Sequence, residues 1–267
     1  MIEQTERARD TLTKHARTFS FASFFLGEET VDKAARLYQF CRVVDDIADE
    51  GDCSDTARVH LNSIRRDLEL GISTNDVTND FLSLASECNI DVQAARTLLE
   101  GVILDLEPVT MSDECALDHY CYQVAGTVGL MMSPILGTND EDALKYACDL
   151  GKAMQLTNIC RDIHEDALKG RIYIPQTLSL SDITKDPAQE NEEMAQACQI
   201  LLLRANTLYE KAEWGLAYLP LRSKLSILVA SRLYKAIGTK LIKKKCMYWK
   251  GRVFTSRTEK IIITLRT

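Results

Sequence analysis

The sequence predicts an all-α protein, and three observations support this fold class. Apolar residues recur at intervals of three and four along eight segments, the spacing that lines one face of a helix. The 267 residues contain only 12 glycines and 5 prolines, and the prolines fall where these patterns already break. With 46% hydrophobic residues the chain can bury a large core, and no linker-like stretch divides it. We therefore expect one domain of long helices over residues 1–267.

The helical periodicity places the expected elements in order along the chain. We expect helices over residues 4–24, 30–50, 54–70, 91–107, 114–136, 140–167, 189–218 and 222–245. Turn-forming residues separate them at Gly27, 51–54, 73–79, 137–139 and 170–187. The last connection is the longest. Its stretch 169–187 is a candidate flap, because long loops beside charged sites often act as lids.

Two acidic clusters, far apart in the sequence, are the strongest functional signal. Residues four apart on a helix share a face, so Asp45 and Asp49 point one way, and Asn158, Asp162 and Asp166 point together. Like charges at this spacing repel, and no Lys or Arg four residues away offsets the first pair within its cluster. We expect a cation to lie between the two acidic strips.

The ligand types favour magnesium bound together with a diphosphate. Well-spaced single carboxylates leave coordination positions to water and phosphate oxygens, which suits Mg²⁺ better than a closed protein cage. Arg42, Arg161 and Arg171 lie near the clusters, and arginine binds phosphate oxygens through two parallel hydrogen bonds. The alternative is that each acidic run is a solvated helix face. The apolar flanks at 37–41 and 154–156 favour burial, and buried acids need partners.

The formal net charge of -7 conceals a basic C-terminal region. Residues 232–267 carry eleven Lys or Arg and a single acid, Glu259. Three interpretations stay open: a solvated helix face, contact with a substrate diphosphate, and attraction to an anionic membrane surface. We expect no nucleic acid partner, because the basic stretch has no interleaved recognition motif.

The cysteines and the N-terminus indicate the compartment. Nine cysteines without paired spacing argue for a reducing environment, and the absence of a CxxC motif argues against structural zinc. The N-terminus has no apolar signal-peptide core, and the longest aliphatic run, 261–263, is too short to span a bilayer. We expect a cytoplasmic protein, with peripheral contact at the inner face of the membrane as an open alternative.

The glycine-containing stretch 126–129 is not a dinucleotide-binding fingerprint, because it lies within a helical pattern and follows no strand. No site for NADPH is visible in the sequence. Gly126 and Gly129 instead thin one face of an apolar helix. This arrangement permits either close helix packing or room for a hydrocarbon chain.

Five ordered motifs give the chain a resemblance to the squalene/phytoene synthase family. They are HARTFS at 15–20, YQFCRVVDD at 38–46, YCYQVAGTVG at 120–129, QLTNICRDIHED at 155–166 and RIYIP at 171–175. The stretches 124–132 and 251–253 look more like bacterial phytoene synthases than squalene synthases. The resemblance implies an isoprenoid synthase helical bundle with a central cavity. It also implies a prenyltransferase that joins two prenyl diphosphates head to head, through a cyclopropylcarbinyl diphosphate, to give phytoene.

The same resemblance assigns roles to individual residues. The implied metal ligands are Asp45, Asp46, Asp49, Asn158, Asp162 and Asp166, with Asp46 facing partly away from the ions. The implied catalytic residues are Tyr120, for the cation steps, and Asp45, Asp49, Asp162 and Asp166. The implied substrate-binding residues are His15, Arg17, Arg42, Asn158, Arg161, Arg171 and Tyr173. The implied cofactor is Mg²⁺, which Mn²⁺ can replace, and the implied partners are prenyl diphosphates.

The family places its chain-length-limiting side chains on the first two helices, where this sequence has Ala22, Ser23, Ala34 and Ala35. Small residues leave a long tunnel, which favours geranylgeranyl over farnesyl diphosphate. A squalene, dehydrosqualene or hydroxysqualene synthase using farnesyl diphosphate is the main alternative.

Two alternatives from other functional classes are a magnesium-dependent pyrophosphohydrolase and a non-catalytic helical partner. All six metal positions keep oxygen ligands, which disfavours a decayed site. Hydrolysis would need a polar pocket, whereas the expected lining is apolar: Phe19, Phe21, Val124, Leu130 and Met131. The sequence makes no prediction of oligomeric state.

Overall fold

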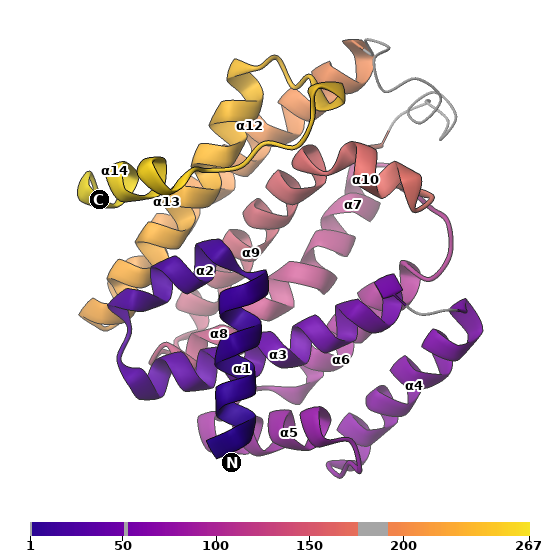
Figure 1. Cartoon of the computed structure of the whole chain (residues 1–267), viewed down its shortest axis with the longest axis vertical. Coiled ribbons are helices and arrows are strands. Elements are labelled where there is room, and N and C mark those ends of the chain that lie inside the picture. The colour runs from indigo at the N-terminus through magenta and orange to yellow at the C-terminus, as the bar shows by residue number, and fades with distance from the viewer. Residues whose placement is uncertain (1, 51–52, 176–191) are drawn as a thin grey trace.

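The computed structural model describes residues 2–50, 53–175 and 192–267, and helices dominate them (Figure 1). The first half contains α1 (Ile2–His15), α2 (Arg17–Ala22), α3 (Glu28–Glu50), α4 (Ser54–Leu70), α5 (Asp76–Cys88) and α6 (Val92–Leu104). The second half contains α7 (Glu114–Cys121), α8 (Thr127–Ile135), α9 (Glu141–Arg161), α10 (Ile163–Leu168), α12 (Glu192–Trp214), α13 (Leu221–Lys243) and α14 (Arg257–Leu265). Short turns of helix lie at Ser23–Phe25 (η1), Tyr122–Gly126 (η2, a π-helix), Gly215–Tyr218 (η3) and Tyr248–Lys250 (η4). The predicted all-α fold class is confirmed.

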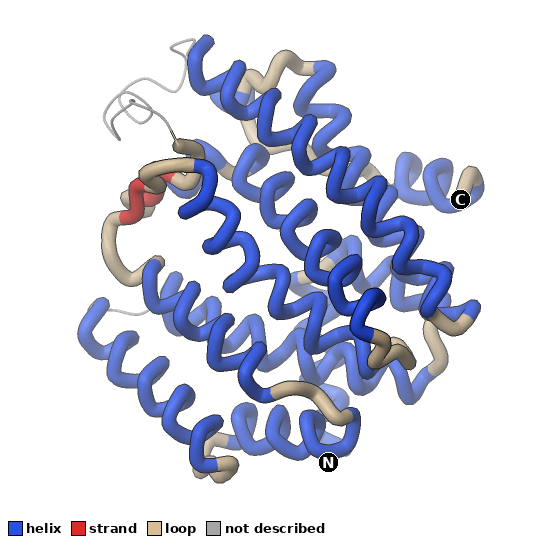
Figure 2. Tube along the Cα trace, turned by 180° about the vertical axis from the view of Figure 1, so that it is seen from behind, coloured by secondary structure: helices blue, strands red, loops and turns tan. Residues whose placement is uncertain are grey.

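Helix α9 is the centre of the second half of the bundle. It packs against α8, α12 and α13, and the long helices run side by side across the molecule (Figures 1 and 2). Buried hydrophobic residues form two principal clusters, one joining α3 to α6 with α8, the other joining α7, α9, α12 and α13. In the described part of the chain, no helix combines the length and apolar content needed to cross a bilayer.

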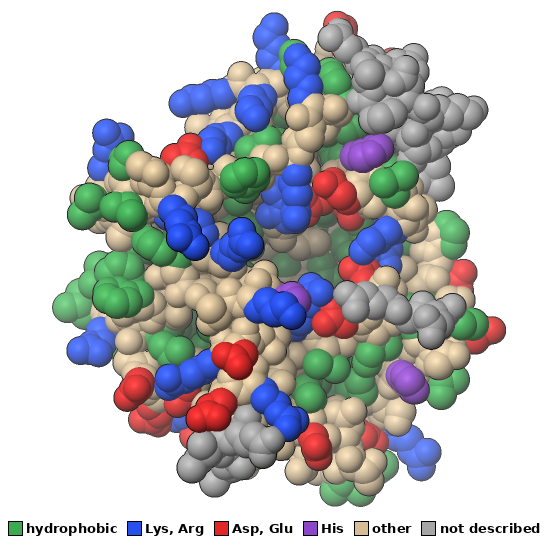
Figure 3. All heavy atoms as spheres, in the orientation of Figure 1, with side chains coloured by type: hydrophobic (Ala, Val, Ile, Leu, Met, Phe, Trp, Pro, Cys, Tyr) green, Lys and Arg blue, Asp and Glu red, His purple; other side chains and the backbone are tan. Residues whose placement is uncertain are grey.

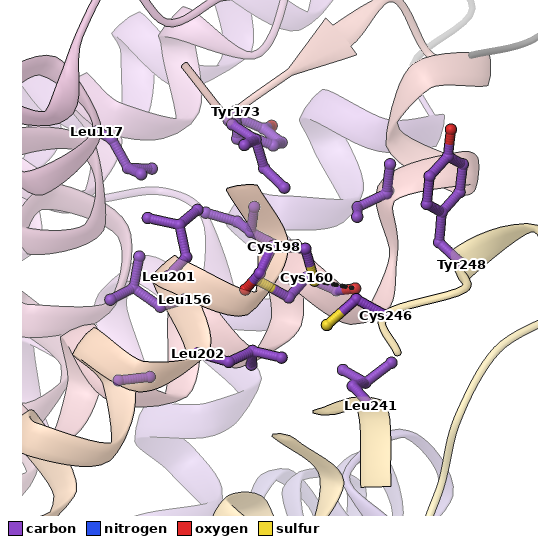
Figure 4. Packing of buried hydrophobic residues seen from close by; sticks show 14 of the residues in the cluster. Leu117, Leu156, Cys160, Tyr173, Cys198, Leu201, Leu202, Leu241, Cys246 and Tyr248 are labelled. Atoms are coloured by element: carbon purple, nitrogen blue, oxygen red, sulfur yellow. Dashed lines mark hydrogen bonds between the residues drawn. The ribbon is translucent and has the colours of Figure 1, made fainter. Parts of the chain in front are cut away.

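Figure 4 shows the second cluster where α9, α12 and the segment after α13 meet. Leu156 and Cys160 of α9 lie beside Leu201 of α12, and Cys246 approaches from the segment after α13. The thiols of Cys160 and Cys198 each donate to the other residue's backbone carbonyl, at 3.6 and 3.8 Å. All nine cysteines are free thiols. These contacts fix the end of α9, which carries the second acidic strip.

One pair of two-residue strands lies at an edge of the bundle (red in Figure 2). β1 (Val109–Thr110) pairs in parallel with β2 (Arg171–Ile172). Strands this short carry no readable periodicity, and the sequence did not predict them. The pair ties the segment after α10 to the loop after α6, and so brings residues distant in sequence to the same place.

Residues 4–24 were predicted as one helix but form α1 and α2, with a break at Ala16 (φ -119°, ψ 59°). Helix α1 packs on α3, whereas α2 packs on α13. One straight helix could not reach both partners, so tertiary packing overrides the continuous helical pattern. The predicted helix 114–136 is likewise divided, into α7, the π-helical turn η2 and α8.

Helices α5 and α14 were not predicted. The polar run before α5 suggested a loop, but Asn75 caps that helix by accepting hydrogen bonds from the backbone N–H groups of Val77 and Thr78. At α14, Ser256 and Glu259 form a capping box. The sequence therefore contained an N-cap signal at the start of each helix, although the first stretch was interpreted only as a turn and the second only as part of a basic region.

Close helix packing explains the glycines of the central helices. A Cβ added at Gly129 would lie 2.3 Å from the carbonyl oxygen of Ala147, and one added at Gly151 would lie 2.2 Å from that of Ala125. At Gly126 an added Cβ would meet the Cys148 sulfur at 2.8 Å. The backbones of η2, α8 and α9 can approach this closely only without side chains at these positions.

We expect Gly151→Ala to lower the free energy of unfolding by about 2–3 kcal/mol, because the added methyl group meets a backbone carbonyl that cannot move aside. Chemical denaturation measures this loss. Gly27→Ala is the matched control, since its nearest new contact lies 3.9 Å away, and we expect a change below about 1 kcal/mol. Equal losses for the two variants would contradict the packing argument.

Candidate active site

Helix α3 carries the first acidic strip on its last turns. Asp46 pairs with Arg42 one turn earlier, with 2.5 Å between Oδ1 and Nη2. Asp49 pairs with Lys169 and Arg171, whose nitrogens lie 2.8 and 2.7 Å from its carboxylate oxygens. Both basic residues come from the segment after α10. The cations that offset Asp49 are therefore distant in sequence and close in space.

The second acidic strip spans the junction of α9 and α10. One helix was predicted over 140–167, but Asp162 (φ -108°, ψ 17°) separates the two. The strip stays aligned because the Asp162 N–H donates to the carbonyl of Asn158, and the Asp166 N–H donates to that of Asp162. The Asp162 carboxylate accepts from Arg161 Nε at 2.8 Å and from Arg252 Nε at 2.7 Å. Arg252 belongs to the basic C-terminal region, so part of that region reaches the site.

Two of the acids have no ion pair among residues 2–50, 53–175 and 192–267. Burial, with the neighbouring Asp49 charge, raises the pKa of Asp45 to about 7. Burial, with the neighbouring Asp162 charge, raises the pKa of Asp166 to about 7. Asp45 is nevertheless accessible, because it lines the cavity described below. These carboxylates need a cation that the described protein groups do not supply.

The paired acids behave in the opposite way. Burial alone would raise the pKa of Asp49, but Lys169 and Arg171 outweigh it and hold that pKa below its usual value. Burial of Asp162 is likewise outweighed by Arg161 and Arg252, so its pKa is lowered. Each strip therefore combines a carboxylate that is already compensated with one that is not.

A cavity of about 360 Å³ adjoins the strips, and its walls are mostly apolar. Asp45, Gln155 and Asn158 bring polar groups to it, and the rings of Tyr38 and Tyr234 also line it. Figure 3 shows a hollow near the middle of one face, with acidic and basic side chains at the rim and hydrophobic side chains inside. The combination can hold a ligand with a charged head and a hydrocarbon tail.

The predicted lining is correct in part. Phe19, Val124, Ala22, Ser23 and Ala34 line the cavity. The other four predicted residues do not, because they pack into buried clusters: Phe21 with the α13 residues, Leu130 and Met131 with α3 and α6, and Ala35 with α1. Gly129 borders the cavity as well as packing on α9, so close packing is confirmed and room for a hydrocarbon chain stays a prediction.

A cluster beside the strips centres on Asp105, which the sequence did not point to. Its carboxylate accepts the hydroxyls of Tyr120 and Tyr173, each at 2.7 Å. The two rings stack, with centroids 4.7 Å apart. Burial raises the pKa of both tyrosines, so they remain donors. Asp105 lies outside every recognised motif, and an isolated aspartate after an apolar helix gives no signal.

The Asp105 cluster contains two of the predicted site residues, Tyr120 and Tyr173. Neither Tyr120 nor Tyr173 lines the main cavity, and both are buried. Tyr173, predicted to bind substrate, donates its hydroxyl proton to Asp105 in this structure. Tyr120, interpreted as acting in the cation steps, occupies the same hydrogen-bonded pair.

The remaining predictions concern the N-terminal motif and the flap. His15 and Arg17 are exposed at the α1–α2 break and do not line the cavity, and the Arg17 carbonyl accepts from Lys260 at 2.9 Å. Within the proposed flap 169–187, Lys169 and Arg171 hold Asp49. Residues 176–187 of that flap lie outside the described residues.

The sequence matches the squalene/phytoene synthase family over residues 12–259. The chain belongs to this family. It is 33% identical to a 15-cis-phytoene synthase of Pantoea ananas, covering 97% of this chain and 89% of that protein. It is 30% identical to the chloroplastic phytoene synthase 1 of Solanum lycopersicum, covering 98% and 67%. The fold matches a crystal structure of a dehydrosqualene synthase with a TM-score of 0.83 and 24% identity, covering 99% and 95%.

In this squalene/phytoene synthase the acidic strips fit a metal that is bound jointly with an anion. The amide oxygen of Asn158 is buried without a hydrogen-bond partner, and Asp45 and Asp166 form no ion pair among the described residues, so that burial raises the pKa of both. Within the described ranges, no three His, Cys, Asp or Glu side chains gather closely enough to hold a metal unaided. Magnesium commonly completes its shell with water and substrate phosphates, so this donor set suits it.

We expect Asp166→Asn to stabilise the metal-free protein at pH 8. The folded pKa of about 7 lies above the unfolded value of 3.8, so the contribution of this group is present below pH 4 and is lost as pH rises towards 7. Removing the charge should recover about 1–2 kcal/mol at pH 8, after allowance for solvent screening, and much less near pH 4. Denaturation series at the two pH values measure the difference.

Asp162→Asn is the matched control on the same strip. Its folded pKa is lowered, so its ionised form stabilises the protein at neutral pH, and its loss should destabilise the fold. A stability gain confined to Asp166→Asn supports the charge assignment. Destabilisation of both variants at pH 8 would contradict it.

Proposed function

We propose that this protein is a phytoene synthase, which condenses two geranylgeranyl diphosphates head to head and releases diphosphate. The observation that carries the proposal is the meeting of an apolar cavity with two acidic strips at one end. Its curated relatives named 15-cis-phytoene synthase support the same reaction. The apolar walls are unsuited to a pyrophosphohydrolase, which must position a water molecule.

The strips would bind the two diphosphates through magnesium. We assign five residues as ligands: Asp45, Asp49, Asn158, Asp162 and Asp166. Asp46 is less suited to bind the metal, because it is already paired with Arg42. When bound, Mg²⁺ offsets the negative charge that develops on the departing diphosphate. Asp45 lines the cavity and forms no ion pair among the described residues, so it is available for this binding.

The basic residues of the site would exchange partners when a diphosphate enters. Lys169, Arg171, Arg161 and Arg252 now neutralise Asp49 and Asp162. With an ion held by those carboxylates, the four basic side chains would no longer be needed to neutralise them and would be free to bind phosphate oxygens. Arginine can bind these oxygens through two parallel hydrogen bonds, which would orient the leaving group.

The cavity would protect the allylic cation formed when diphosphate leaves. Apolar walls exclude the water that would otherwise capture the cation. The rings of Phe19, Tyr38 and Tyr234 line the cavity, and aromatic faces attract positive charge. Ala22, Ser23 and Ala34 leave space along the wall, which supports a geranylgeranyl chain.

The basic C-terminal region would bring the enzyme to an anionic membrane surface, where its substrate and product are soluble. We define the C-terminal face as exposed Lys243, Lys244, Lys245, Lys250, Phe254, Arg257, Ile261, Leu265 and Arg266. Helix α14 lies on α13, and Lys240 links the two by donating to the Phe254 carbonyl and to Glu259. Leu265 is 82% exposed and Phe254 71% exposed, and Lys and Arg side chains gather at the upper left of Figure 3. Exposed apolar groups flanked by basic ones suit peripheral binding.

Incubation with Mg²⁺ and geranylgeranyl diphosphate should yield phytoene without NADPH, identified by mass spectrometry of the extracted hydrocarbon. Asp45→Asn should lower kcat about 100-fold or more while the protein stays folded, because metal-held diphosphate is lost. Squalene or dehydrosqualene formed from farnesyl diphosphate, with geranylgeranyl diphosphate left unused, would contradict the proposal.

Ala34→Phe tests the role of the cavity wall. It should lower turnover of geranylgeranyl diphosphate about tenfold relative to that of farnesyl diphosphate.

Binding to vesicles should depend on the C-terminal face. We expect the protein to sediment with vesicles that contain phosphatidylglycerol, and to be released by salt. Ile261→Ser combined with Leu265→Ser should reduce binding about tenfold, because two exposed apolar anchors are lost. Val59→Ser combined with Ile72→Ser removes equally exposed groups elsewhere and should leave binding intact. Equal effects of the two double variants would rule out this face.

A further inference from the structure

Asp105 connects four separate parts of the chain at one point. It follows the last residue of α6, and its carboxylate accepts hydrogen bonds from Tyr120 of α7 and from Tyr173 after β2. Its backbone carbonyl accepts from Arg171 Nε at 3.1 Å and from Arg171 Nη2 at 2.8 Å. Arg171 Nη1 in turn donates to Asp49 of α3 at 2.7 Å.

We infer that Asp105 is a positioning residue of this enzyme: its carboxylate sets the orientation of the stacked Tyr120 and Tyr173 rings, and its carbonyl sets that of Arg171. The inference rests on the proposed function, because it gives Asp105 a purpose in prenyl transfer. It adds a residue to the site that the recognised motifs do not contain.

The two carboxylate bonds restrict both rings at once. Each hydroxyl lies 2.7 Å from a different oxygen of the same carboxylate, and the ring planes are inclined by only 18°. A carboxylate acceptor makes such bonds stronger than neutral ones. Both tyrosines are almost fully buried, so no water can replace the acceptor without rearrangement. Loss of the carboxylate should therefore release both rings together.

The backbone bonds to Arg171 act through a different atom of the same residue. A side-chain substitution at Asp105 leaves the carbonyl, and so leaves the link from Arg171 to Asp49. Diphosphate binding should then survive while the reacting geometry suffers. This separation predicts a loss in kcat, expressed per folded enzyme because unfolding also lowers the apparent kcat, with little change in KM.

The test compares Asp105→Ala and Asp105→Asn with Tyr120→Phe and Tyr173→Phe. The alanine variant should lower kcat about 10- to 100-fold, with KM within about threefold. The asparagine variant should retain more activity, because its amide can still bond both hydroxyls. Adding the two phenylalanine substitutions to Asp105→Ala should cost little more, since they remove the same bonds.

Asp91→Ala is the control at the other end of α6, where Asp91 caps the helix by accepting from the Gln93 N–H. It should lower the unfolding temperature but leave kcat within about twofold. The positioning role is overturned if Asp105→Ala retains kcat, or if its loss simply multiplies with the losses of the tyrosine variants.

Near-ultraviolet circular dichroism gives a readout that needs no turnover. The stacked tyrosine signal should weaken in Asp105→Ala and persist in Asp91→Ala. If the unaltered protein forms no prenyl product, the proposed function fails, and the dichroism still decides whether Asp105 holds the rings. An unchanged tyrosine signal in Asp105→Ala overturns the inference.

Discussion

Burial of carboxylates close to one another is the constraint on which the site depends. Burial, together with the charges of neighbouring carboxylates, raises the pKa of Asp45 and of Asp166 to about 7. The protein pairs Asp49 and Asp162 with basic residues from distant segments, whereas Asp45 and Asp166 form no ion pair among the described residues. That imbalance costs stability in the metal-free protein, and a cation arriving with a diphosphate would remove the cost.

The remainder of the fold holds these charges against an apolar cavity. Close approach of η2 and α8 to α9, through Gly129 and Gly151, brings the walls together. The buried cluster around Cys160 and Leu156 fixes the end of α9, just before the second strip. The short strand pair then places Arg171 between Asp49 and Asp105. Rigid helices thus support the acids, while the basic partners come mostly from connecting segments.

The sequence revealed what depends on local spacing. Helical periodicity predicted the fold class, and the four-residue spacing of Asp45 with Asp49, and of Asn158 with Asp162 and Asp166, predicted strips that the structure retains. Contacts between residues far apart in the sequence could not be predicted. Lys169 pairs with Asp49, Arg252 pairs with Asp162, and Asp105 accepts hydrogen bonds from two tyrosines. Ala35 illustrates the same limit. Ala34 faces the cavity, whereas Ala35, the next residue on the same helix, packs against α1.

We expect metal and diphosphate to bind to the strips only together. Isothermal titration calorimetry of Mg²⁺ into the protein, with and without an unreactive geranylgeranyl thiolodiphosphate, tests it most directly. We expect weak Mg²⁺ binding alone and much tighter binding when the analogue is present, because no described group of three ligands closes a metal site. Tight Mg²⁺ binding without the analogue, or analogue binding that is equally tight without Mg²⁺, would contradict it.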